Sequence, residues 1–342
     1  MMAPMNSRMF RHEPDVRIDS PDRILAASRR FMESRVLLSG FELGVFTALE
    51  HGPRTSTQVA RTVKADPRAT ARLLSALCSL GLLRKKDGYF RNAPTAARFL
   101  VQGRPDYLAG LGHTVNLWDT WSDLTESVRR GRSVLKAPPS RRGRDFFMPF
   151  IAAMHARAVP QAKAIVRSIP LAKVSRVLDV GGGSGAYAMT FARAKPGLLA
   201  TVFDLPQVAP LTKDYIKKAG LAKRVDVRVG DYNRDGLPRG NDLIFLSAII
   251  HSCSPTGIRK LFEKCARALN PGGLIVVQEF VVNEDRTAPA FSVFFALNML
   301  VDTPRGDTYT ESEIRLWLQE AGFGAVKRQD TPFNTTLMIG RL

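Results

Sequence analysis

The sequence is poor in cysteine and in long apolar runs, and each shortage excludes a class of protein. Its three cysteines, Cys78, Cys253 and Cys265, are odd in number and far apart, so they indicate neither a disulfide framework nor a zinc knuckle. The longest strongly apolar run, Phe291–Val301, is too short to cross a bilayer, which takes about 20 residues. The first residues are charged and lack the apolar segment of a signal peptide. We therefore expect a soluble, cytoplasmic protein without a membrane span.

Acidic residues are scarce relative to basic ones, and the formal net charge is +19. A charge of this sign is compatible with nucleic-acid binding, because lysine and arginine neutralise phosphates. The basic residues are nevertheless spread along the chain. Their one concentration, residues 129–144, holds two prolines and two glycines, which is typical of a solvated linker. We interpret the charge as a general surface property and expect no nucleic-acid partner.

The N-terminal part has a helical pattern. Between residues 22 and 121, apolar residues recur at three- and four-residue spacing, and residues 82–100 then read as a strand, a Lys-Asp-Gly turn and a second strand. Three helices followed by such a hairpin are typical of a winged helix-turn-helix, which serves either DNA binding or dimerisation. The candidate recognition helix, residues 68–81, is mostly apolar and small. A cofactor-sensing DNA-binding regulator is thus the disfavoured alternative.

The C-terminal part alternates strands and helices. Strands are predicted at residues 176–180, 198–204, 224–231, 241–250 and 272–282, with helices between several of them. This alternation predicts an α/β fold with an open, doubly wound, mostly parallel sheet. A helix at 310–323 leads into two further strands, which predict an antiparallel hairpin and seven strands in all. This arrangement is shared by class I methyltransferases. The expected domains are an N-terminal arm (1–20), a winged-helix dimerisation domain (21–125), a linker with helices over the acceptor pocket (126–170) and a cofactor-binding catalytic domain (171–342).

The most specific local motif is VLDVGGGSGAYA, residues 177–188. A strand that runs through glycines into a helix forms a ligand cradle, because backbone N–H groups can approach the ligand there. Gly181, Gly183 and Ala186 also satisfy the dinucleotide form G-x-G-x-x-A. A nicotinamide oxidoreductase is therefore a competing hypothesis.

Acidic residues near the predicted strand ends help to decide between a nicotinamide dinucleotide and a cofactor that contains an amino acid. Asp179, just before the loop, would repel a pyrophosphate but suits the ammonium of an amino-acid cofactor. Asp204 can accept both ribose hydroxyls, a role common to both cofactors. Asp231 can accept from the adenine amino group while Tyr232 stacks on the base. Because ligands of open α/β sheets bind at the carboxyl ends of strands, the set favours S-adenosylmethionine.

Long ordered segments in both halves resemble one family. They are residues 40–60, 66–83 and 88–100, and then LDVGGGSG, FDLPQVAP, GDYN, LSAIIH, LNPGGLIVVQE and TYTESEIRLWLQEAGF. The sequence is similar to the small-molecule O-methyltransferases, which include plant caffeate and flavonoid enzymes, animal acetylserotonin O-methyltransferase, and bacterial carotenoid and polyketide enzymes. The resemblance implies S-adenosylmethionine as donor, S-adenosylhomocysteine as product, a homodimer formed through the N-terminal domain, and secondary metabolism. The predicted cofactor-binding residues are Asp179, Gly181, Gly183, Asp204, Leu205, Asp231, Tyr232 and Ser247.

The resemblance also places His251 at the family's general base and Glu279 at the carboxylate that orients it. A hydroxyl attacks the methyl group well only when its proton is leaving, and an imidazole held by a carboxylate can accept that proton. Ser252 and Cys253 stand where the family typically has Asp-Trp, and Thr308 stands where many plant members have a second orienting glutamate. Methylation of carbon or nitrogen on the same scaffold is therefore an alternative.

The predicted acceptor is an aromatic or polyene-type small molecule. Two apolar segments, residues 146–154 and 291–299, are expected to form the wall of its pocket. The residues assigned to that wall are Phe147, Met154, Phe294, Phe295 and Met299. The sequence contains no carboxylate cluster typical of a divalent cation, so no metal is expected.

Overall fold

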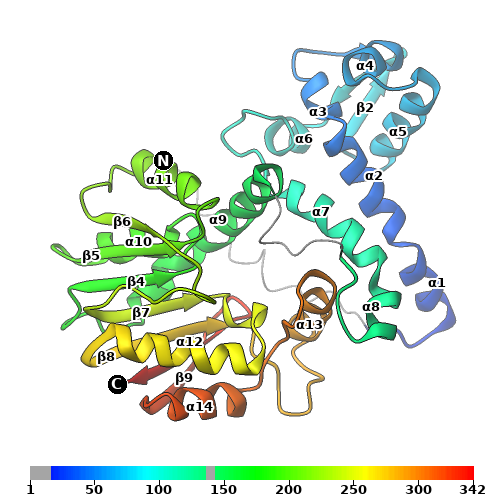
Figure 1. The fold of residues 1–342 in the computed structure, drawn as a ribbon. Coiled ribbons are helices and arrows are strands. Elements are labelled where there is room, and N and C mark those ends of the chain that lie inside the picture. Colours follow the sequence, from blue (N-terminus) through cyan, green and yellow to red (C-terminus); the bar gives the residue numbers. More distant parts are fainter. Residues whose placement is uncertain (1–16, 136–142) are drawn as a thin grey trace. The chain divides into compact units, whose positions relative to one another are not determined.

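The computed structural model describes residues 17–135 and 143–342. The chain forms two compact units, Asp15–Trp118 and Asp119–Leu342 (Figure 1). Most of the predicted N-terminal arm (residues 1–16) and the centre of the predicted basic linker (residues 136–142) lie outside the described residues. No helix in the described ranges is long and apolar enough to span a bilayer.

The N-terminal unit is mainly helical. Its helices are α1 (Pro21–Arg29), α2 (Phe31–Glu42), α3 (Val45–Ala48), α4 (Ser56–Val63), α5 (Pro67–Ser79), α6 (Pro94–Phe99) and the greater part of α7 (Leu111–Ser122). Local sequence fixes their starts: Thr55 and Gln58 form a capping box on α4, and Asp66 accepts from the Ala69 N–H before α5 (2.8 Å). Leu74 and Leu77 of α5 are fully buried in the core of this unit.

A small antiparallel sheet completes this unit. It contains β1 (Arg54–Thr55), β2 (Leu83–Lys86) and β3 (Tyr89–Asn92) in the order β1-β3-β2. Asp87 and Gly88 make the tight turn between β2 and β3, and both have positive φ angles (+51° and +81°), as a two-residue hairpin turn requires. Phe90 points from β3 into the helical core. The predicted winged-helix arrangement is confirmed.

The C-terminal unit is an α/β sandwich. Its helices include α8 (Leu124–Arg130), α9 (Arg144–Arg167), α10 (Ala186–Ala194), α11 (Ala209–Lys218), the short 3-10 helix η3 (Ile250–Ser252), α12 (Pro255–Ala268), α13 (Ala290–Asp302) and α14 (Glu311–Glu320). Its strands are β4 (Arg176–Val180), β5 (Leu199–Asp204), β6 (Val225–Val229), β7 (Asn241–Ser247), β8 (Leu269–Glu279), β9 (Gly324–Asp330) and β10 (Thr336–Arg341).

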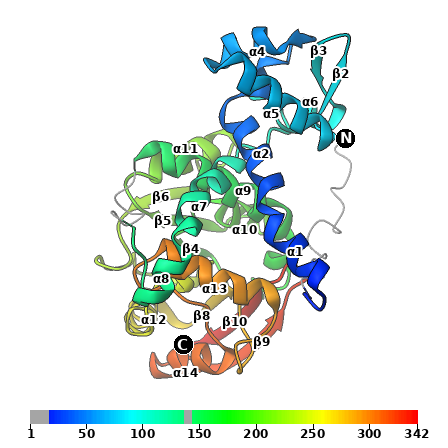
Figure 2. The same cartoon turned by 90° about the vertical axis from the view of Figure 1, so that its right-hand side faces the viewer.

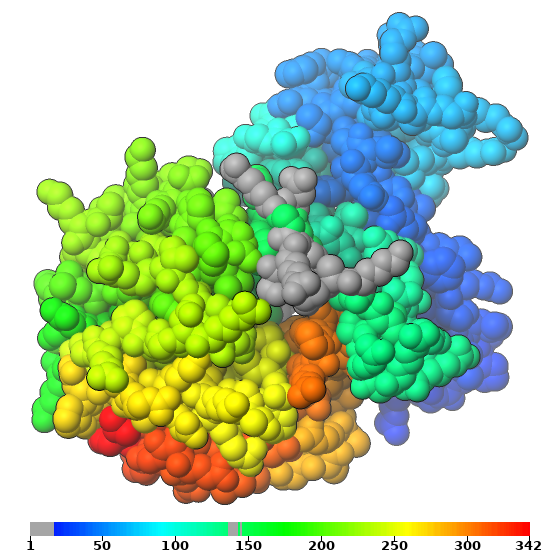
Figure 3. All heavy atoms as spheres, in the orientation of Figure 1, coloured from blue at the N-terminus to red at the C-terminus, as the bar shows by residue number. Residues whose placement is uncertain are grey.

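These strands form one seven-stranded sheet in the order β6-β5-β4-β7-β8-β10-β9. The first five are parallel neighbours, whereas β10 is antiparallel to both β8 and β9. The predicted doubly wound sheet with an antiparallel C-terminal hairpin is confirmed. Figure 3 shows the C-terminal residues (red) at the surface beside yellow residues, and Leu342 N donates to Gly273 O (3.0 Å).

Alternation along the central strands divides the core between two layers of helices. On β7, Leu243 and Phe245 face the layer that contains α9, α10 and α11, whereas Ile244 and Leu246 face the layer that contains α12 and α14. The helices α12 and α14 lie side by side in both views (Figures 1 and 2). Because both faces are covered, the parallel strands are apolar almost throughout.

The order of the strands places their polar ends together. The strand order switches sides between β4 and β7, because β5 and β6 extend the sheet on one side of β4 whereas β7 and β8 extend it on the other. The loops that leave β4 and β7 therefore go to opposite faces of the sheet and leave a crevice at the carboxyl ends of these strands. Asp204 is the last residue of β5, Ser247 the last of β7 and Glu279 the last of β8. The fold thus gathers side chains that are far apart in the sequence.

Candidate active site

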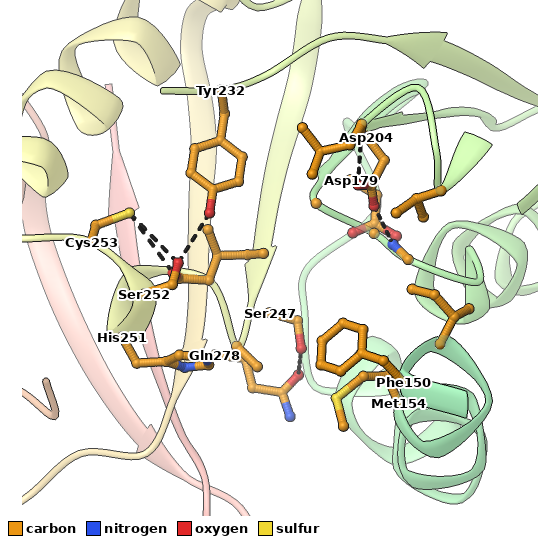
Figure 4. A pocket seen from close by; sticks show the side chains of 18 of the residues that line it. Phe150, Met154, Asp179, Asp204, Tyr232, Ser247, His251, Ser252, Cys253 and Gln278 are labelled. Atoms are coloured by element: carbon orange, nitrogen blue, oxygen red, sulfur yellow. Dashed lines mark hydrogen bonds between the residues drawn. The ribbon is translucent and has the colours of Figure 1, made fainter. Parts of the chain in front are cut away.

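A cavity of about 530 Å³ opens at this carboxyl edge of the sheet, within the C-terminal unit. Figure 4 shows Tyr232, Ser252 and His251 on one side, Asp179 and Asp204 on the other, and side chains of α9 on a third. All eight predicted cofactor residues line it: Asp179, Gly181, Gly183, Asp204, Leu205, Asp231, Tyr232 and Ser247. Its volume is that of a small-molecule site.

The glycine loop after β4 needs glycine for two separate reasons. Gly181 and Gly183 have φ angles of +64° and +57°, which residues with a Cβ rarely adopt. At Gly181 a Cβ would also meet Ile249 Cδ1 at 2.3 Å, whereas at Gly183 the nearest atom, Ile151 Cδ1, is 3.5 Å away. The loop backbone therefore lies at the cavity wall, and a side chain at Gly181 would force the Ile249 side chain to move.

We expect Gly181→Ala to destabilise the protein more than Gly183→Ala. Both variants force an alanine into positive φ, at a cost of about 1–2 kcal/mol, but only Gly181→Ala adds the clash with Ile249. The clash adds roughly 1–3 kcal/mol, as overpacking does. Denaturant unfolding of the two variants measures the difference, and equal free energies of unfolding would contradict this account of the loop.

Asp204 joins the end of β5 to the glycine loop. Its carboxylate accepts from Gly183 N (2.8 Å) and Leu205 N (2.7 Å). Burial raises the pKa of Asp204 to about 6, and the two backbone hydrogen bonds limit that rise. Each carboxylate oxygen has a second lone-pair direction, so both can still accept from a ligand that enters the cavity.

Asp179 is a fully buried acid with an unused oxygen. Its Oδ2 accepts from Ala188 N (3.1 Å), whereas its Oδ1 has no hydrogen-bond partner in the described structure. Burial raises the pKa of Asp179 to about 7, and the charge of Asp204 adds to the effect, against the hydrogen bond from Ala188. A buried carboxyl group that lacks a partner at the cavity wall suits a cationic ligand.

This raised pKa predicts a pH-dependent stability. Because the pKa of Asp179 is higher in the folded chain (about 7) than in an unfolded chain (about 4), the group stabilises the fold below pH 4 and loses that contribution as pH rises through 7. Asp179→Asn should therefore raise the melting temperature of the ligand-free protein, by roughly 5 °C at pH 8 and far less at pH 4.5.

Asp242 provides a control with the opposite sign. Burial raises its pKa, but the hydrogen bonds from Asn270 and from two backbone N–H groups outweigh that and hold the pKa below its usual value. Its stabilisation is lost as pH falls, so Asp242→Asn should lower the melting temperature at pH 8. If Asp179→Asn gives no gain at pH 8, the buried carboxyl group is not charged there.

Asp231 and Tyr232 follow β6. Asp231 accepts from Asn233 N (2.9 Å), and Arg234 lies 3.7 Å from its other oxygen. The Tyr232 hydroxyl is 3.0 Å from Ser252 Oγ, which in turn donates to Ile249 O (2.8 Å). Ser252 thus helps to fix the tyrosine ring at the cavity wall (Figure 4).

Ser247, at the end of β7, donates to Gln278 Oε1 (3.1 Å) of the neighbouring β8. Gln278 also donates from its Nε2 to Thr335 Oγ1 (3.2 Å) and Gln161 Oε1 (3.4 Å). Ser247 is therefore held in a network of uncharged polar groups between β7, β8 and α9, at the back of the cavity.

His251 and Glu279 meet beside the same cavity. His251 Nδ1 lies 2.8 Å from Glu279 Oε1, and the His251 backbone N donates to Oε2 (3.3 Å). The His251 side chain is 12% exposed and lines the cavity, whereas the Glu279 side chain is fully buried behind it. The Phe295 ring packs edge-on against the imidazole, with centroids 4.8 Å apart.

The predicted acceptor wall is only partly in place. Phe147 and Met154 of α9 line the cavity, whereas Phe294, Phe295 and Met299 of α13 are not among its lining residues, so their part in an acceptor wall stays a prediction. Met299 is 5% exposed in the core and Phe294 is 49% exposed, since successive helical residues point about 100° apart. Phe295 packs against Phe280 and His251 and supports the imidazole from outside the cavity.

Several cavity residues were not among the predicted site residues, and the most consequential is Arg157. It belongs to a face of α9 that includes Phe150, Met154, Ala158 and Gln161, all of which line the cavity. These positions recur every three or four residues, as on one side of a helix. The sequence signal for Arg157 is that it is a basic residue on a helix face whose other residues are apolar or uncharged.

The sheet order, the glycine loop and the acids at the strand ends together define a class I methyltransferase. Residues 121–324 match the family model of the O-methyltransferase domain, and residues 25–102 match that of the O-methyltransferase dimerisation domain. The chain therefore belongs to the O-methyltransferase family, whose members use S-adenosylmethionine. The dimerisation domain supports formation of a homodimer.

Relatives along almost the whole chain agree with this assignment. The 3-hydroxy-5-methyl-1-naphthoate 3-O-methyltransferase of Streptomyces sahachiroi is 34% identical over 301 residues, which cover 86% of this chain and 87% of the relative. The tetracenomycin polyketide synthesis 8-O-methyl transferase of Streptomyces glaucescens is 32% identical over 340 residues, 96% of this chain and 98% of the relative. Human N-acetylserotonin methyltransferase, solved in complex with S-adenosylmethionine, superimposes with a TM-score of 0.80 at 28% identity and covers 95% of this chain and 98% of that one.

These matches decide between the alternatives. An S-adenosylmethionine-dependent O-methyltransferase of the secondary-metabolism kind is established as the class, so the nicotinamide, regulator and carbon- or nitrogen-methylating hypotheses are set aside. In the described ranges, no group of three or more histidine, cysteine or acidic side chains could hold a metal ion.

Proposed function

We propose that the enzyme methylates a hydroxyl group on an aromatic small molecule, with His251 as the general base and Glu279 as the residue that positions it. The observation that carries this proposal is the 2.8 Å contact between His251 Nδ1 and Glu279 Oε1 at the wall of the cavity. No other histidine that lines this cavity is found in the described chain.

The hydrogen bonds around Glu279 fix the tautomer of the imidazole. The carboxylate accepts from the backbone N–H groups of His251 (3.3 Å) and Phe280 (3.0 Å). Burial raises the pKa of Glu279, but the interaction with His251 and these hydrogen bonds outweigh it and hold the pKa below its usual value. An ionised Glu279 can only accept, so His251 Nδ1 carries a proton and Nε2 offers its lone pair to the acceptor.

The same pair stabilises the product of proton transfer. When Nε2 takes the hydroxyl proton, the imidazole becomes a cation next to the Glu279 carboxylate in a buried setting, where charges interact strongly. The edge of the Phe295 ring limits rotation of the imidazole. The chain therefore supplies a base whose orientation and charge are prepared before the acceptor arrives.

The cofactor residues fit an adenosyl amino acid. Asp204 would accept from the ribose hydroxyls and Asp231 and Tyr232 would hold the adenine, since all three line the cavity. The Asp179 carboxyl group, whose Oδ1 has no partner, would attract the ammonium group. The glycine backbone at Gly181 leaves space for close approach. When bound, S-adenosylmethionine supplies an electrophilic methyl group on a positive sulfur. The residues of the chain align donor and acceptor and exclude water.

The acceptor class follows from the cavity and the relatives. Phe147, Phe150, Ile151 and Met154 of α9 give an apolar wall that accommodates a flat ring system. The two relatives from Streptomyces act, by their names, on a hydroxynaphthoate and in tetracenomycin polyketide synthesis. We infer that the acceptor here is a phenolic hydroxyl on a fused aromatic system.

Glu279→Gln tests the positioning role. Glutamine keeps the shape and can still accept from the backbone, but it does not stabilise the imidazolium, so kcat should fall about 10- to 100-fold with little change in the affinity for S-adenosylhomocysteine. The pH profile of kcat should also move, because the imidazole loses its neighbouring charge. A merely structural Glu279 would lower the melting temperature and leave the pH profile where it is.

A further inference from the structure

Arg157 is a basic side chain in a largely apolar part of the cavity. It lies on the face of α9 that carries Phe150 and Met154, and it lines the cavity together with His251 and Phe280. Its surroundings disfavour the charged form, since burial lowers the pKa of Arg157. A guanidinium nevertheless stays protonated in proteins, so the cavity contains a permanent positive charge.

No carboxylate in the described chain pairs with this charge. Arg157 makes neither a hydrogen bond nor an ion pair within 4 Å with any residue whose placement is described; its contacts are with aromatic rings. Its Cζ lies 4.2 Å from the Phe280 ring centroid and 5.7 Å from that of Phe291. Cation–π contacts stabilise the guanidinium, but an aromatic ring has no net charge, so the positive charge of Arg157 is not neutralised.

The nearest acid is already engaged. The charges that raise the pKa of Arg157 are those of Tyr187 and Glu279, acting at longer range. Glu279 accepts from His251 Nδ1 and from two backbone N–H groups, so it is not available as a direct partner. A cation held away from bulk water without an anion is costly. Its retention in a ligand site indicates that an incoming ligand completes the pair.

The surroundings of Arg157 indicate which ligand this is. Phe280 follows Glu279 at the end of β8, and the Phe280 ring stacks 6.0 Å from the imidazole of His251. The guanidinium is thus at the end of the cavity where His251 lies. Asp179 lies on β4 and Asp204 ends β5, which are two and three strands away from β8 in the sheet. The guanidinium therefore faces the methyl acceptor rather than the adenosine.

We propose that Arg157 binds an anionic substituent of the acceptor, so that the enzyme acts on an aromatic hydroxy acid whose carboxylate pairs with the guanidinium while its hydroxyl reaches His251. This inference rests on the proposed acceptor site and deepens it. A planar guanidinium suits a planar carboxylate, because two parallel N–H donors can meet its two oxygens. Arg157 is then a specificity-determining residue, since an uncharged analogue would leave the cation unpaired.

The test uses matched pairs of probes. Hydroxybenzoates, hydroxynaphthoates and hydroxyanthracene carboxylates, each with its carboxamide, are titrated by calorimetry into the full-length enzyme loaded with S-adenosylhomocysteine. For at least one pair the acid should bind tenfold or more tightly than the amide, as a charge-assisted hydrogen bond gives. Arg157→Gln should abolish the preference, and Arg157→Lys should keep part of it. Arg167→Gln, which removes an exposed arginine from the end of the same helix, should leave it intact.

Each other outcome has a definite meaning. If every acid binds no better than its amide, or if Arg157→Gln keeps the preference, the proposal is wrong. A tenfold loss of S-adenosylhomocysteine affinity in Arg157→Gln also overturns it and assigns the guanidinium to the carboxylate of the cofactor. If Arg157→Gln melts well below the wild type, Arg157→Lys decides: a stable Lys variant without acid preference overturns the proposal as well.

Failure of the proposed function is recognised separately. If an acid preference that depends on Arg157 persists while His251→Ala methylates at the wild-type rate, the anion site stands and the base assignment falls. If His251→Ala is inactive and no acid preference exists, the base assignment stands and the anion site falls.

Discussion

The His251→Ala variant is expected to methylate its acceptor about 10²–10⁴-fold more slowly than the wild type in single turnovers, because that is what a positioned general base contributes. The affinity for S-adenosylhomocysteine should stay within about threefold, since the predicted cofactor residues lie on or directly after β4, β5, β6 and β7 and keep their contacts. Stopped-flow mixing of the preloaded enzyme with acceptor measures the first quantity, and calorimetry the second.

Two controls separate the base from general damage to the site. Raising the pH until a phenolic acceptor ionises should restore much of the rate of His251→Ala, since an ionised acceptor needs no base. Ser252→Ala, one residue along, removes the hydroxyl that contacts Tyr232 and should leave the chemical step nearly unchanged. Wild-type turnover by His251→Ala at neutral pH would remove the histidine from the mechanism.

Replacing Asp204 with asparagine should weaken S-adenosylhomocysteine binding about 100-fold or more. In the proposed cofactor site this carboxylate would accept from two ribose hydroxyls, and charge-assisted hydrogen bonds of this kind contribute about 1.5–3 kcal/mol each. Asparagine also places an amide NH₂ against the backbone N–H of Gly183 or Leu205, both of which donate to Asp204 in the structure. Isothermal titration gives the dissociation constants directly.

Asp226 offers a matched control for this substitution. It is an exposed acid on β6, the strand next to β5, and it pairs with Arg228 at the surface (3.0 Å). Asp226→Asn removes the same charge and should change neither the affinity nor the melting temperature, as is usual for exposed pairs. Equal affinities of the wild type and Asp204→Asn would mean that the cofactor does not use the end of β5.

The fold, and the gathering of the predicted cofactor residues at one cavity, could be predicted from the sequence because short-range patterns determine them. The alternation of Leu243 to Leu246 marks a strand covered on both faces. The carboxyl ends of parallel strands meet at one edge, so acids at those ends, such as Asp204, fall together whatever the lengths of the intervening helices. The same rule brought Glu279 to His251, although 28 positions separate them.

The residues of the proposed acceptor wall could not be predicted from the sequence in the same way. The helix α13 is apolar nearly all round, so its sequence does not show which of its faces meets a cavity, and it did not distinguish the exposed Phe294 from the buried Met299. In α9, by contrast, Arg157 breaks an uncharged face, but its meaning depends on Phe280 and Glu279, which come from a distant strand. Side-chain environments built by long-range packing require the three-dimensional structure.

The most direct test of the central claim is a crystal structure of the enzyme with S-adenosylhomocysteine and a methylatable aromatic hydroxy compound. The account predicts that the acceptor hydroxyl oxygen lies within about 2.6–3.2 Å of His251 Nε2, on the side of the cavity where the donor's sulfur points. An acceptor bound productively with its hydroxyl beyond the reach of His251, even through one water molecule, would contradict it.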